Sequence, residues 1–529
     1  MTETKTKPLV NARIVGNELA ALLPEDGRSW IFKSHLVMLN FYIVVVMMSP
    51  VTMGFDGSMM NGLLSLTTWN DYFDRPRSSL LGLINAVLSL GVLLAAFPAG
   101  IICDKYGRRA SIIGGTIVLL VATALQASSH NVAQFIVSRF LIGVGIELTC
   151  MPAPVLVTEL AYPTHRGKVT ALYNVFFYVG AIASSWITFG TFPLNTTWGW
   201  RIPSILQAVF TIFQLAFIWF VPESPRWLIS KGRTDEARAF FVRYHAGGNE
   251  NDVLVDFEMS EVTQYLQSEI ESSKMKWSSL WETKADRRRL LIIVFVPFIS
   301  QWAGNGLITY YLSLVLDTIG ITDSFSQTLI NGILQIFNAC AALFGSLLVD
   351  RLGRRTLWLW SAVGMLMSYV AWTICSAINF NTGNSASGIL VIVFIFIYFF
   401  HYDIAVTPFT WSYPAELLPF HNRSKGMSIV NFINGLTLLF NSFVNPIAIA
   451  AIEWKYYIVY DVILVVILLV IFFLFPETRG RTLEEIGEIF ESGTPAWRTG
   501  SMGFGSGNTA IDEKLDTAVE VETAEVVEK

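Results

Sequence analysis

The sequence predicts an all-α membrane protein with twelve transmembrane helices in two pseudo-symmetric six-helix bundles. Composition is the first reason: the 529 residues are 53% hydrophobic and only 15% charged, whereas soluble proteins carry about 25% charged residues. The second reason is that apolar stretches of about 20 residues, long enough to cross roughly 30 Å of hydrocarbon, recur along almost the whole chain. The third is an internal repeat, described below.

We place the twelve spans at residues 36–57, 79–102, 110–128, 132–157, 168–190, 201–221, 290–316, 326–349, 357–379, 388–413, 427–452 and 456–475. A long polar stretch separates the first six spans from the last six. The predicted units are a cytoplasmic N-terminal segment (1–34), an N-terminal bundle (35–222), a cytoplasmic inter-bundle loop with short helices (223–289), a C-terminal bundle (290–476) and a largely disordered cytoplasmic tail (477–529).

Three motifs recur across the polar stretch. They are DKYGRR (104–109) and DRLGRR (350–355), PESPR (222–226) and PETRG (476–480), and the pairs Glu159 with Arg166 and Glu416 with Arg423. The offsets are 246, 254 and 257 positions. Because chance does not give three matched offsets, we interpret the chain as a duplicated six-helix unit. Transporters with parallel repeats bind their substrate near the bilayer midplane, between the halves.

Lysine and arginine gather in the loops on one side of the predicted spans, which by the positive-inside rule is the cytoplasmic side. We therefore expect both termini to be cytoplasmic and the protein to reside in the plasma membrane. This orientation places the sequon at Asn195 outside, where it can be glycosylated. The four cysteines lie in or at the ends of predicted helices, which favours packing residues over a disulfide framework or a metal cluster.

The repeated motifs place both signs of charge at the inner ends of adjacent helices in each half. The residues are Asp104, Arg108, Arg109, Glu159, Arg166, Glu223 and Arg226 in the first half, and Asp350, Arg354, Arg355, Glu416, Arg423 and Glu477 in the second. Such a cluster can act as a cytoplasmic latch that ties helices together when the protein faces outward and separates when it faces inward. The alternative is that these charges only enforce topology.

Together with RFLIGVG (139–145), these motifs resemble the sugar porter family of the major facilitator superfamily across essentially the whole chain. The stretches GFDGSMMNG (54–62), YNVFFYVG (173–180), EARAFFVRYHAGG (236–248) and QWAGNGLITYYL (301–312) are most similar to the fungal lactose-permease and cellodextrin-transporter branch. The resemblance implies the major facilitator fold and sugar import by alternating access, with a disaccharide such as lactose or cellobiose as substrate, and hexoses as further candidates.

A sugar site needs amides for the hydroxyls and an aromatic plane for the ring. The resemblance carries the family's sugar contacts onto Asn174, Gln301, Asn305, Asn338, Trp411 and Asn434. Tyr310 and Tyr311 would close over the substrate or, alternatively, anchor the span at the membrane interface. For Asn331, Asn441 and Asn445 we favour helix-to-helix packing.

This chain departs from the family pattern at three positions of the sugar site. Asn174, Ser300 and Gly306 carry shorter side chains than the family usually has, or none. We expect the extra room to favour a disaccharide. Trp411 lies between Pro408 and Pro414, so we expect the tenth span to be broken or bent.

Asp56 is the only side chain between Lys33 and Asp71 that is charged at neutral pH. The fourth span carries Arg139 and Glu147, and in proton-driven relatives the acid at this position faces that arginine. Protonation of Asp56 would release Arg139, so we assign Asp56, Arg139 and Glu147 to proton coupling. The alternative is a permanent ion pair with facilitated diffusion.

Two further features of the membrane spans have open interpretations. Gly54, Gly57 and Gly62 predict a close-packing surface on the first span. His401 and Asp403 in the tenth span have no counterpart in the family and form either a local pair or a second proton path.

Two other functions are compatible with these patterns. A sugar sensor would signal through its tails, and a carrier of another polyhydroxylated metabolite would use the same fold. No nucleophile–base set, metal-ligand spacing or Walker-type loop occurs in the sequence, so we expect no enzyme, cofactor or metal. The expected partners are sugar, protons and the lipid bilayer; we expect a monomer that does not bind nucleic acid.

Overall fold

The computed structural model describes residues 33–273, 276–479, 481 and 483–499 of the chain, and a few side chains within these ranges, Asp350 among them, are outside the description. The described residues form twelve helices that are long and apolar enough to cross a membrane. Each of these helices overlaps one predicted span, so the prediction of twelve spans is confirmed. The described residues contain no β-strand. The N-terminal segment before Lys33 and the tail after Thr499, for which we predicted cytoplasmic location and disorder, lie outside the described residues.

The first half comprises α3 (Ser34–Val46), α4 (Met48–Leu64), α5 (Thr67–Tyr72), α6 (Ser78–Tyr106), α7 (Arg108–Ala127), α8 (Val132–Cys150), α9 (Ala153–Leu160), α10 (Arg166–Thr191) and α11 (Trp198–Ile218). The second half comprises α15 (Lys284–Trp302), α16 (Asn305–Thr318), α17 (Ser324–Leu352), α18 (Arg354–Thr382), α19 (Ser385–Leu417), α20 (Phe420–Ile452) and α21 (Lys455–Leu474). The linker between them holds α12 (Pro225–Ser230), α13 (Thr234–Phe240), the π-helical turn η2 (Phe241–His245), α14 (Val253–Ser273) and η3 (Trp277–Leu280); α22 (Leu483–Glu491) and η4 (Ala496–Arg498) follow α21.

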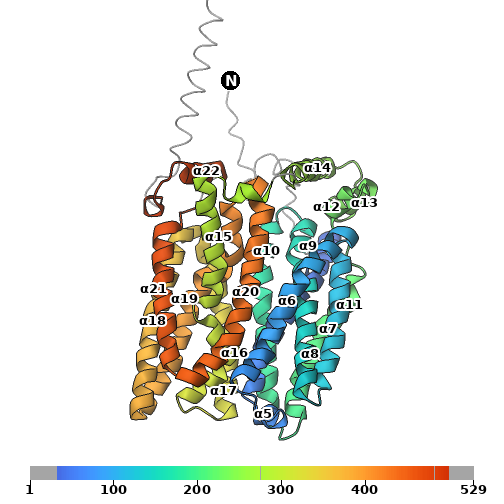
Figure 1. The fold of residues 1–529 in the computed structure, drawn as a ribbon. Helices are drawn as coiled ribbons and strands as arrows, with labels where there is room; N and C mark the ends of the chain where they lie inside the picture. The colour runs from blue at the N-terminus through green and yellow to red at the C-terminus, as the bar shows by residue number, and fades with distance from the viewer. Residues whose placement is uncertain (1–32, 274–275, 480, 482, 500–529) are drawn as a thin grey trace, which may run out of the picture.

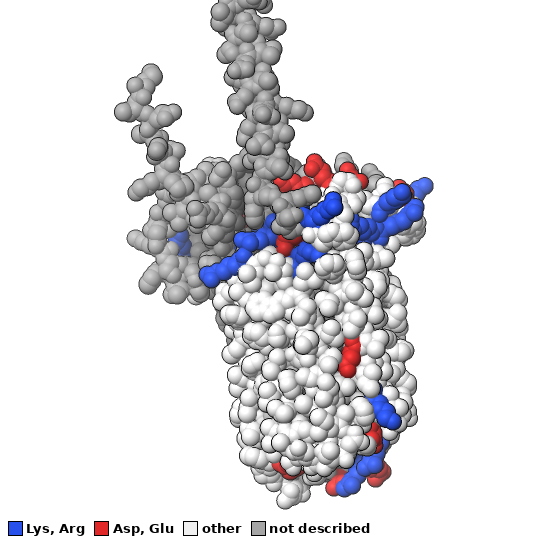
Figure 2. All heavy atoms as spheres, turned by 90° about the vertical axis from the view of Figure 1, so that its left-hand side faces the viewer, with Lys and Arg blue, Asp and Glu red and all other residues white. Residues whose placement is uncertain are grey.

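The two halves stand side by side, with the linker helices and α22 at one end and α5 at the other (Figure 1). We call these ends the linker side and the α5 side. Figure 2, which views the second half, shows charged side chains gathered toward the two ends, with a nearly uncharged belt between them. This distribution suits a bilayer, because charged groups are costly in hydrocarbon.

Three spans are made of two helices each. The first breaks at Met47, between α3 and α4; the fourth at Met151 and Pro152, between α8 and α9; and the seventh at Ala303 and Gly304, between α15 and α16. Gly304 has φ 103°, a left-handed conformation that glycine adopts without steric cost. Discontinuous helices of this kind expose backbone groups inside a transporter, where they can contact a substrate.

The tenth span, which we expected to be broken or bent, is not broken. Helix α19 runs continuously through both Pro408 and Pro414. Each proline removes one backbone hydrogen bond, but neighbouring helices hold such a segment in place in a membrane bundle. Here α18 and α17 pack along α19, so the prolines do not divide it.

The part of the linker around α13 and η2 packs on the first half. Phe240, Phe241 and Tyr244 join a buried cluster with residues of α3, α9 and α11. The turn η2 directs His245 inward, where its Nδ1 lies 2.7 Å from a Glu258 carboxylate oxygen and its Nε2 lies 3.3 Å from the Leu160 carbonyl at the end of α9. These two contacts fasten η2 to α14 and to the end of α9.

Candidate functional site

A buried ion pair lies inside the first half. Helix α4 supplies Asp56, α8 supplies Arg139 and α11 supplies Gln207. Arg139 Nη1 lies 2.6 Å from Asp56 Oδ1, and Gln207 Nε2 donates to the same oxygen over 3.2 Å. The two charged side chains are only 2% and 4% exposed. Each charge offsets the desolvation of the other, so loss of either would leave a buried unpaired charge.

The position of Asp56 depends on a close contact between α4 and α10. A Cβ on Gly54 would lie 1.9 Å from the Phe177 carbonyl oxygen, and a Cβ on Gly180 would lie 1.9 Å from the Val51 carbonyl oxygen. Backbone therefore meets backbone, and no other residue fits at either position. The sequence indicated the glycines of the first span, including Gly54, but not their counterpart Gly180 on α10.

Glu147 is separate from this ion pair. It lies eight residues after Arg139, is 8% exposed, and its carboxylate interacts with the Asn431 side chain of α20, in the other half. Among the residues with described side chains, no cation forms an ion pair with Glu147. The structure therefore does not bring the three residues that we assigned to proton coupling into one cluster.

Several of the predicted sugar contacts meet in the second half. Gln301 Nε2 donates to Asn434 Oδ1 over 3.1 Å, and Asn305 Nδ2 donates to the Tyr402 hydroxyl over 3.0 Å. These four residues come from α15, α20, α16 and α19, so four helices converge here. Amides in this arrangement can donate and accept hydrogen bonds, as recognition of sugar hydroxyls requires.

Two of the predicted contacts carry a buried acceptor oxygen that has no partner in the described part of the chain. These are Asn338 Oδ1 on α17 and Asn305 Oδ1 on α16. Buried polar atoms nearly always have a partner, so an unpaired one requires an explanation. Asn174 on α10 is exposed, and Trp411 on α19 is 40% exposed. Neither makes a hydrogen bond or ring contact with the described residues.

Tyr310 and Tyr311 occupy different environments. Tyr311 is fully buried, and its hydroxyl donates to the Ser442 carbonyl of α20 over 2.5 Å. It therefore cannot serve as an anchor at the membrane interface. Tyr310 is partly buried against the same cluster as Phe55 and Trp69.

Gly306 does not leave room for a larger sugar, contrary to our expectation. A Cβ at this position would lie 2.3 Å from Asn441 Nδ2, so the Asn441 amide already fills the space. That amide donates to the Gln301 carbonyl over 2.6 Å. Ser300 is 5% exposed, which also leaves little space beside it. Of the three positions, only Asn174 is appreciably exposed.

The residues for which we favoured packing do make helix-to-helix hydrogen bonds. Asn441 and Asn445 both accept from the Tyr460 hydroxyl of α21. Asn331 does more, because it joins the two halves: its Nδ2 donates to Ser185 of α10 over 3.1 Å, and its Oδ1 accepts from Asn61 of α4 over 3.3 Å.

Asn61 closes the α5 side between the halves. Its Nδ2 donates to the Ile308 carbonyl over 3.2 Å, and its Oδ1 accepts from the Leu312 backbone N–H over 3.0 Å. Both partners lie in α16, beside its non-helical residue Tyr311. No sequence pattern indicates this contact, because the register between α4 and α16 is a property of the folded chain.

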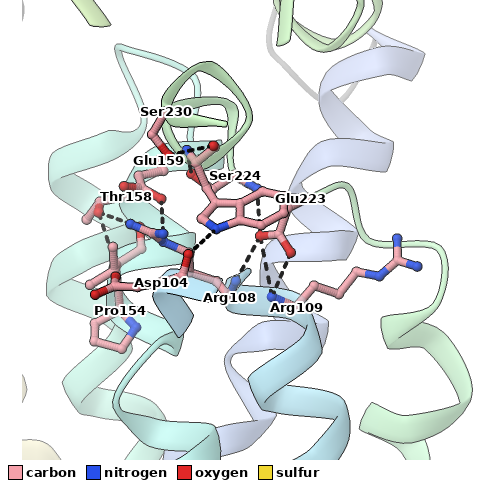
Figure 3. A network of polar contacts seen from close by, with 11 residues as sticks. Asp104, Arg108, Arg109, Pro154, Thr158, Glu159, Glu223, Ser224 and Ser230 are labelled. Atoms are coloured by element: carbon pink, nitrogen blue, oxygen red, sulfur yellow. Dashed lines mark hydrogen bonds and ion pairs between the residues drawn. The ribbon is translucent and has the colours of Figure 1, made fainter. Parts of the chain in front are cut away.

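A charged network lies at the linker side of the first half (Figure 3). The Glu223 carboxylate accepts from the backbone N–H groups of Arg108 and Arg109, each at 3.1 Å, and so caps the start of α7. Arg108 Nε lies 3.5 Å from Glu159, and Trp227 Nε1 donates to the Asp104 carbonyl over 3.1 Å. Burial raises the pKa of Glu223, although the backbone hydrogen bonds favour the charged form.

The second half repeats this network. Glu477 accepts from the backbone N–H groups of Arg354 at 2.8 Å and Arg355 at 3.1 Å, which begin α18. Arg354 lies 3.3 Å from Glu416. The glycine before each capped helix also matches, since Gly107 has φ 100° and Gly353 has φ 89°.

Not every predicted member joins these networks. Arg226 stacks on the Tyr265 ring at 4.3 Å, and Arg423 donates to the Leu418 carbonyl over 3.5 Å. Neither of them, nor Arg166, pairs with an acid whose side chain the structure describes. The side chain of Asp350 lies outside the described residues. Each network stays within one half, so it holds the helix ends of one bundle together.

The comparisons with known proteins agree with this architecture. Residues 41–490 match the family model described as "Sugar (and other) transporter". The chain is 29% identical over 470 residues to the MFS-type transporter oryC of Aspergillus oryzae, covering 86% of each chain. It is 28% identical over 491 residues to high-affinity glucose transporter 1 of Candida albicans, covering 89% of each.

Among solved structures, the inward open conformation of the xylose transporter XylE from E. coli superposes with a TM-score of 0.71 at 21% identity, covering 85% of this chain and 99% of that one. This likeness shows that the fold is the major facilitator fold. The family model covers most of the chain, and the relatives are transporters rather than enzymes. The chain therefore belongs to the sugar porter family of the major facilitator superfamily and is a multi-pass membrane transporter of sugars.

Proposed function

We propose that the protein is a monomeric proton-coupled sugar importer of the plasma membrane, with both termini cytoplasmic. The predicted substrate is a disaccharide such as lactose or cellobiose. Hexoses are the second candidate, and relatives named as glucose transporters favour them. The observation that carries proton coupling is the buried contact of 2.6 Å between Asp56 and Arg139.

The electrostatics of the Asp56–Arg139 ion pair are suited to proton coupling. Arg139 favours the ionised form of Asp56, whereas burial favours the protonated form, so the charge state depends on how the helices are arranged. When a proton binds Asp56, Arg139 loses its anionic partner and α4 is free to shift relative to α8. A proton that enters down a membrane potential gains about 2.3 kcal/mol per 100 mV, which corresponds to roughly fiftyfold accumulation of sugar.

The sugar itself would bind between the halves. The amide groups of Gln301, Asn305, Asn338 and Asn434 supply hydrogen bonds from the second half, and the unpaired oxygens of Asn305 and Asn338 are suited to accept from sugar hydroxyls. Asn174 faces them from the first half in this proposal, and Trp411 offers an apolar plane. Tyr310 would close over the sugar.

The two linker-side networks would keep each bundle rigid while the bundles move against each other. The α5 side is closed by Asn61, Asn331 and Ser185 in the present structure. These contacts cross between the halves and must break for the α5 side to open. Contacts within a half, such as that of Arg108 with Glu159, need not break.

The test is uptake in a yeast that lacks its own sugar transporters. Labelled lactose, cellobiose, glucose and xylose are supplied with and without an uncoupler, and sugar-induced alkalinisation of the medium is recorded. We expect one or more of these sugars to accumulate only when the proton gradient is intact. Asp56→Asn should abolish alkalinisation while exchange of sugar down its gradient survives.

The matched control is Asp71→Asn, because Asp71 is 59% exposed and pairs with Arg75 at the protein surface. It should leave accumulation unchanged. Alkalinisation that persists in Asp56→Asn would show that this carboxyl is not the coupling group. Uptake that is insensitive to the uncoupler would instead favour a facilitative uniporter with a permanent Asp56–Arg139 pair.

A further inference from the structure

A second buried carboxyl lies at the junction of the two halves. The Tyr178 hydroxyl of α10 donates to Asp403 Oδ1 of α19 over 2.8 Å, so this hydrogen bond joins the first half to the second. The Thr407 hydroxyl donates to the same oxygen over 2.8 Å. Asp403 is 1% exposed, and its Oδ2 is buried without a partner among the described residues.

This contact lies between the two sites already described. On one side, Tyr402, the neighbour of Asp403, accepts from the Asn305 amide and donates to the Ser300 carbonyl over 2.8 Å. On the other side, Phe177, the neighbour of Tyr178, touches the backbone of α4 at Gly54. The Tyr178–Asp403 bond therefore connects the helix that carries Asp56 to the helix that holds a candidate sugar contact.

Asp403 forms no ion pair with any residue whose side chain the structure describes. The titratable groups that interact with it are phenols: Tyr178 from α10, and Tyr398 and Tyr402 from its own helix. No charged group of α15, α17, α18 or α20 interacts with it, as far as their side chains are described. His401 turns the other way, since its ring bonds the Ile397 carbonyl and lies against Gly364 of α18. Among the described residues of the first half, Tyr178 is therefore the one whose hydrogen bond depends on the charge state of Asp403.

We propose that Asp403 is a second titratable group of the transport cycle, and that its ionised carboxylate holds Tyr178 and thereby holds the two halves in the arrangement with the α5 side closed. A carboxylate accepts a hydrogen bond about twice as strongly as a neutral acid. Protonation should therefore shift the balance toward separated halves by roughly tenfold. The proposal rests on alternating access and not on the role of Asp56.

The experiment measures the distance between the halves directly and needs no sugar. The four native cysteines are replaced, and two exposed residues on the α5 side are changed to cysteine and spin-labelled. They are His130→Cys in the loop between α7 and α8 of the first half, and Thr382→Cys at the end of α18 in the second half. Electron–electron distance distributions are recorded for the full chain in lipid nanodiscs between pH about 8 and about 5, the range over which a buried carboxyl can titrate. Lowering the pH should raise the ratio of molecules with a long distance between the two labels to molecules with a short one by roughly tenfold.

In the Asp56→Asn background, where Asp56 cannot titrate, Asp403→Asn and Tyr178→Phe should each abolish this pH response. Asp403→Asn does so because the group no longer titrates, and Tyr178→Phe because the hydrogen bond is gone. The control Thr410→Val removes a hydroxyl of the same helix that bonds only the Val406 carbonyl, so it should keep the response. Asp56→Asn should also keep it, which separates this proposal from the proposed coupling site. A response that persists in the Asp56→Asn background with either Asp403→Asn or Tyr178→Phe overturns the proposal, as does a parent protein without one.

Discussion

The two halves of the molecule are alike at the linker side and different inside the membrane. Glu223 and Glu477 cap equivalent helices through the same backbone bonds. Inside, the first half holds an ion pair of Asp56 with Arg139, whereas the second holds Asp403 with only hydroxyl partners. The helix-capping contacts that stiffen each bundle are thus alike in the two halves, whereas the buried acidic groups have different partners.

The largest effect should follow from breaking the ion pair of Asp56 with Arg139 in the first half. Arg139→Met leaves Asp56 buried without its cation, which costs about 3–5 kcal/mol of folding free energy. We expect a large loss of folded protein, measured by thermal unfolding on a size-exclusion column. The double variant Asp56→Asn with Arg139→Met should recover much of that stability, although transport should stay uncoupled. Equal instability of the single and double variants would contradict the burial argument.

The next effect concerns the turn η2 of the linker, which packs on the first half. His245→Gln removes the ring nitrogen that lies 2.7 Å from the buried Glu258 carboxylate. Because a buried carboxylate that loses a hydrogen-bond partner is costly, we expect the free energy of unfolding to fall by about 3 kcal/mol. Limited proteolysis of the linker, together with the unfolding temperature, measures it. Arg243→Gln, on the exposed side of the same turn, is the control and should have little effect. If both variants behave alike, the buried pair does not hold the linker.

A smaller effect should be shared by both halves. Glu223→Ala and Glu477→Ala each remove a carboxylate that caps two backbone N–H groups, and each should cost about 1–2 kcal/mol. The two unfolding temperatures should fall by similar amounts. A fall in only one of them would mean that the networks look alike but do not contribute alike, which would weaken the comparison between the halves.

The smallest effect tests the orientation that both halves share. Asn195 is exposed in the loop between α10 and α11, on the α5 side. Asn195→Gln should leave transport unchanged and, in a glycosylating host, should remove a mobility shift that glycosidase also removes. Asn422 is buried and bonded to Ser279, so a shift that depended on the sequon at Asn422 would reverse the proposed topology.

Much of the fold was predictable because membrane spans and repeats leave a direct signal in the sequence. The apolar runs gave all twelve spans, and the repeated motifs gave the paired networks of Arg108 with Glu159 and Arg354 with Glu416. The contact of Asp56 with Arg139 followed from resemblance to relatives. These features depend on local composition or on motif spacing, both of which a sequence displays.

What the sequence did not predict depends on how helices meet in space. Gln207 reaches Asp56 from a helix 151 positions away in the chain, and Tyr178 reaches Asp403 across 225 positions. Asn441 fills the space beside Gly306 because of the packing of α16 on α20. No local pattern encodes these distances. Of the two alternatives for the tenth span, broken or bent, a break is excluded for a related reason, since packing on α17 and α18 outweighs the local preference of proline.

The backbone contact between α4 and α10 limits how this carrier can be redesigned. At Gly54 and Gly180 there is no side chain to trim and no room to add one, so libraries that vary substrate range should leave both positions fixed. The amides of the second half, held by side-chain bonds such as that of Gln301 with Asn434, offer more freedom. Selection for new sugars should therefore accumulate its changes on α15, α16, α17 and α20.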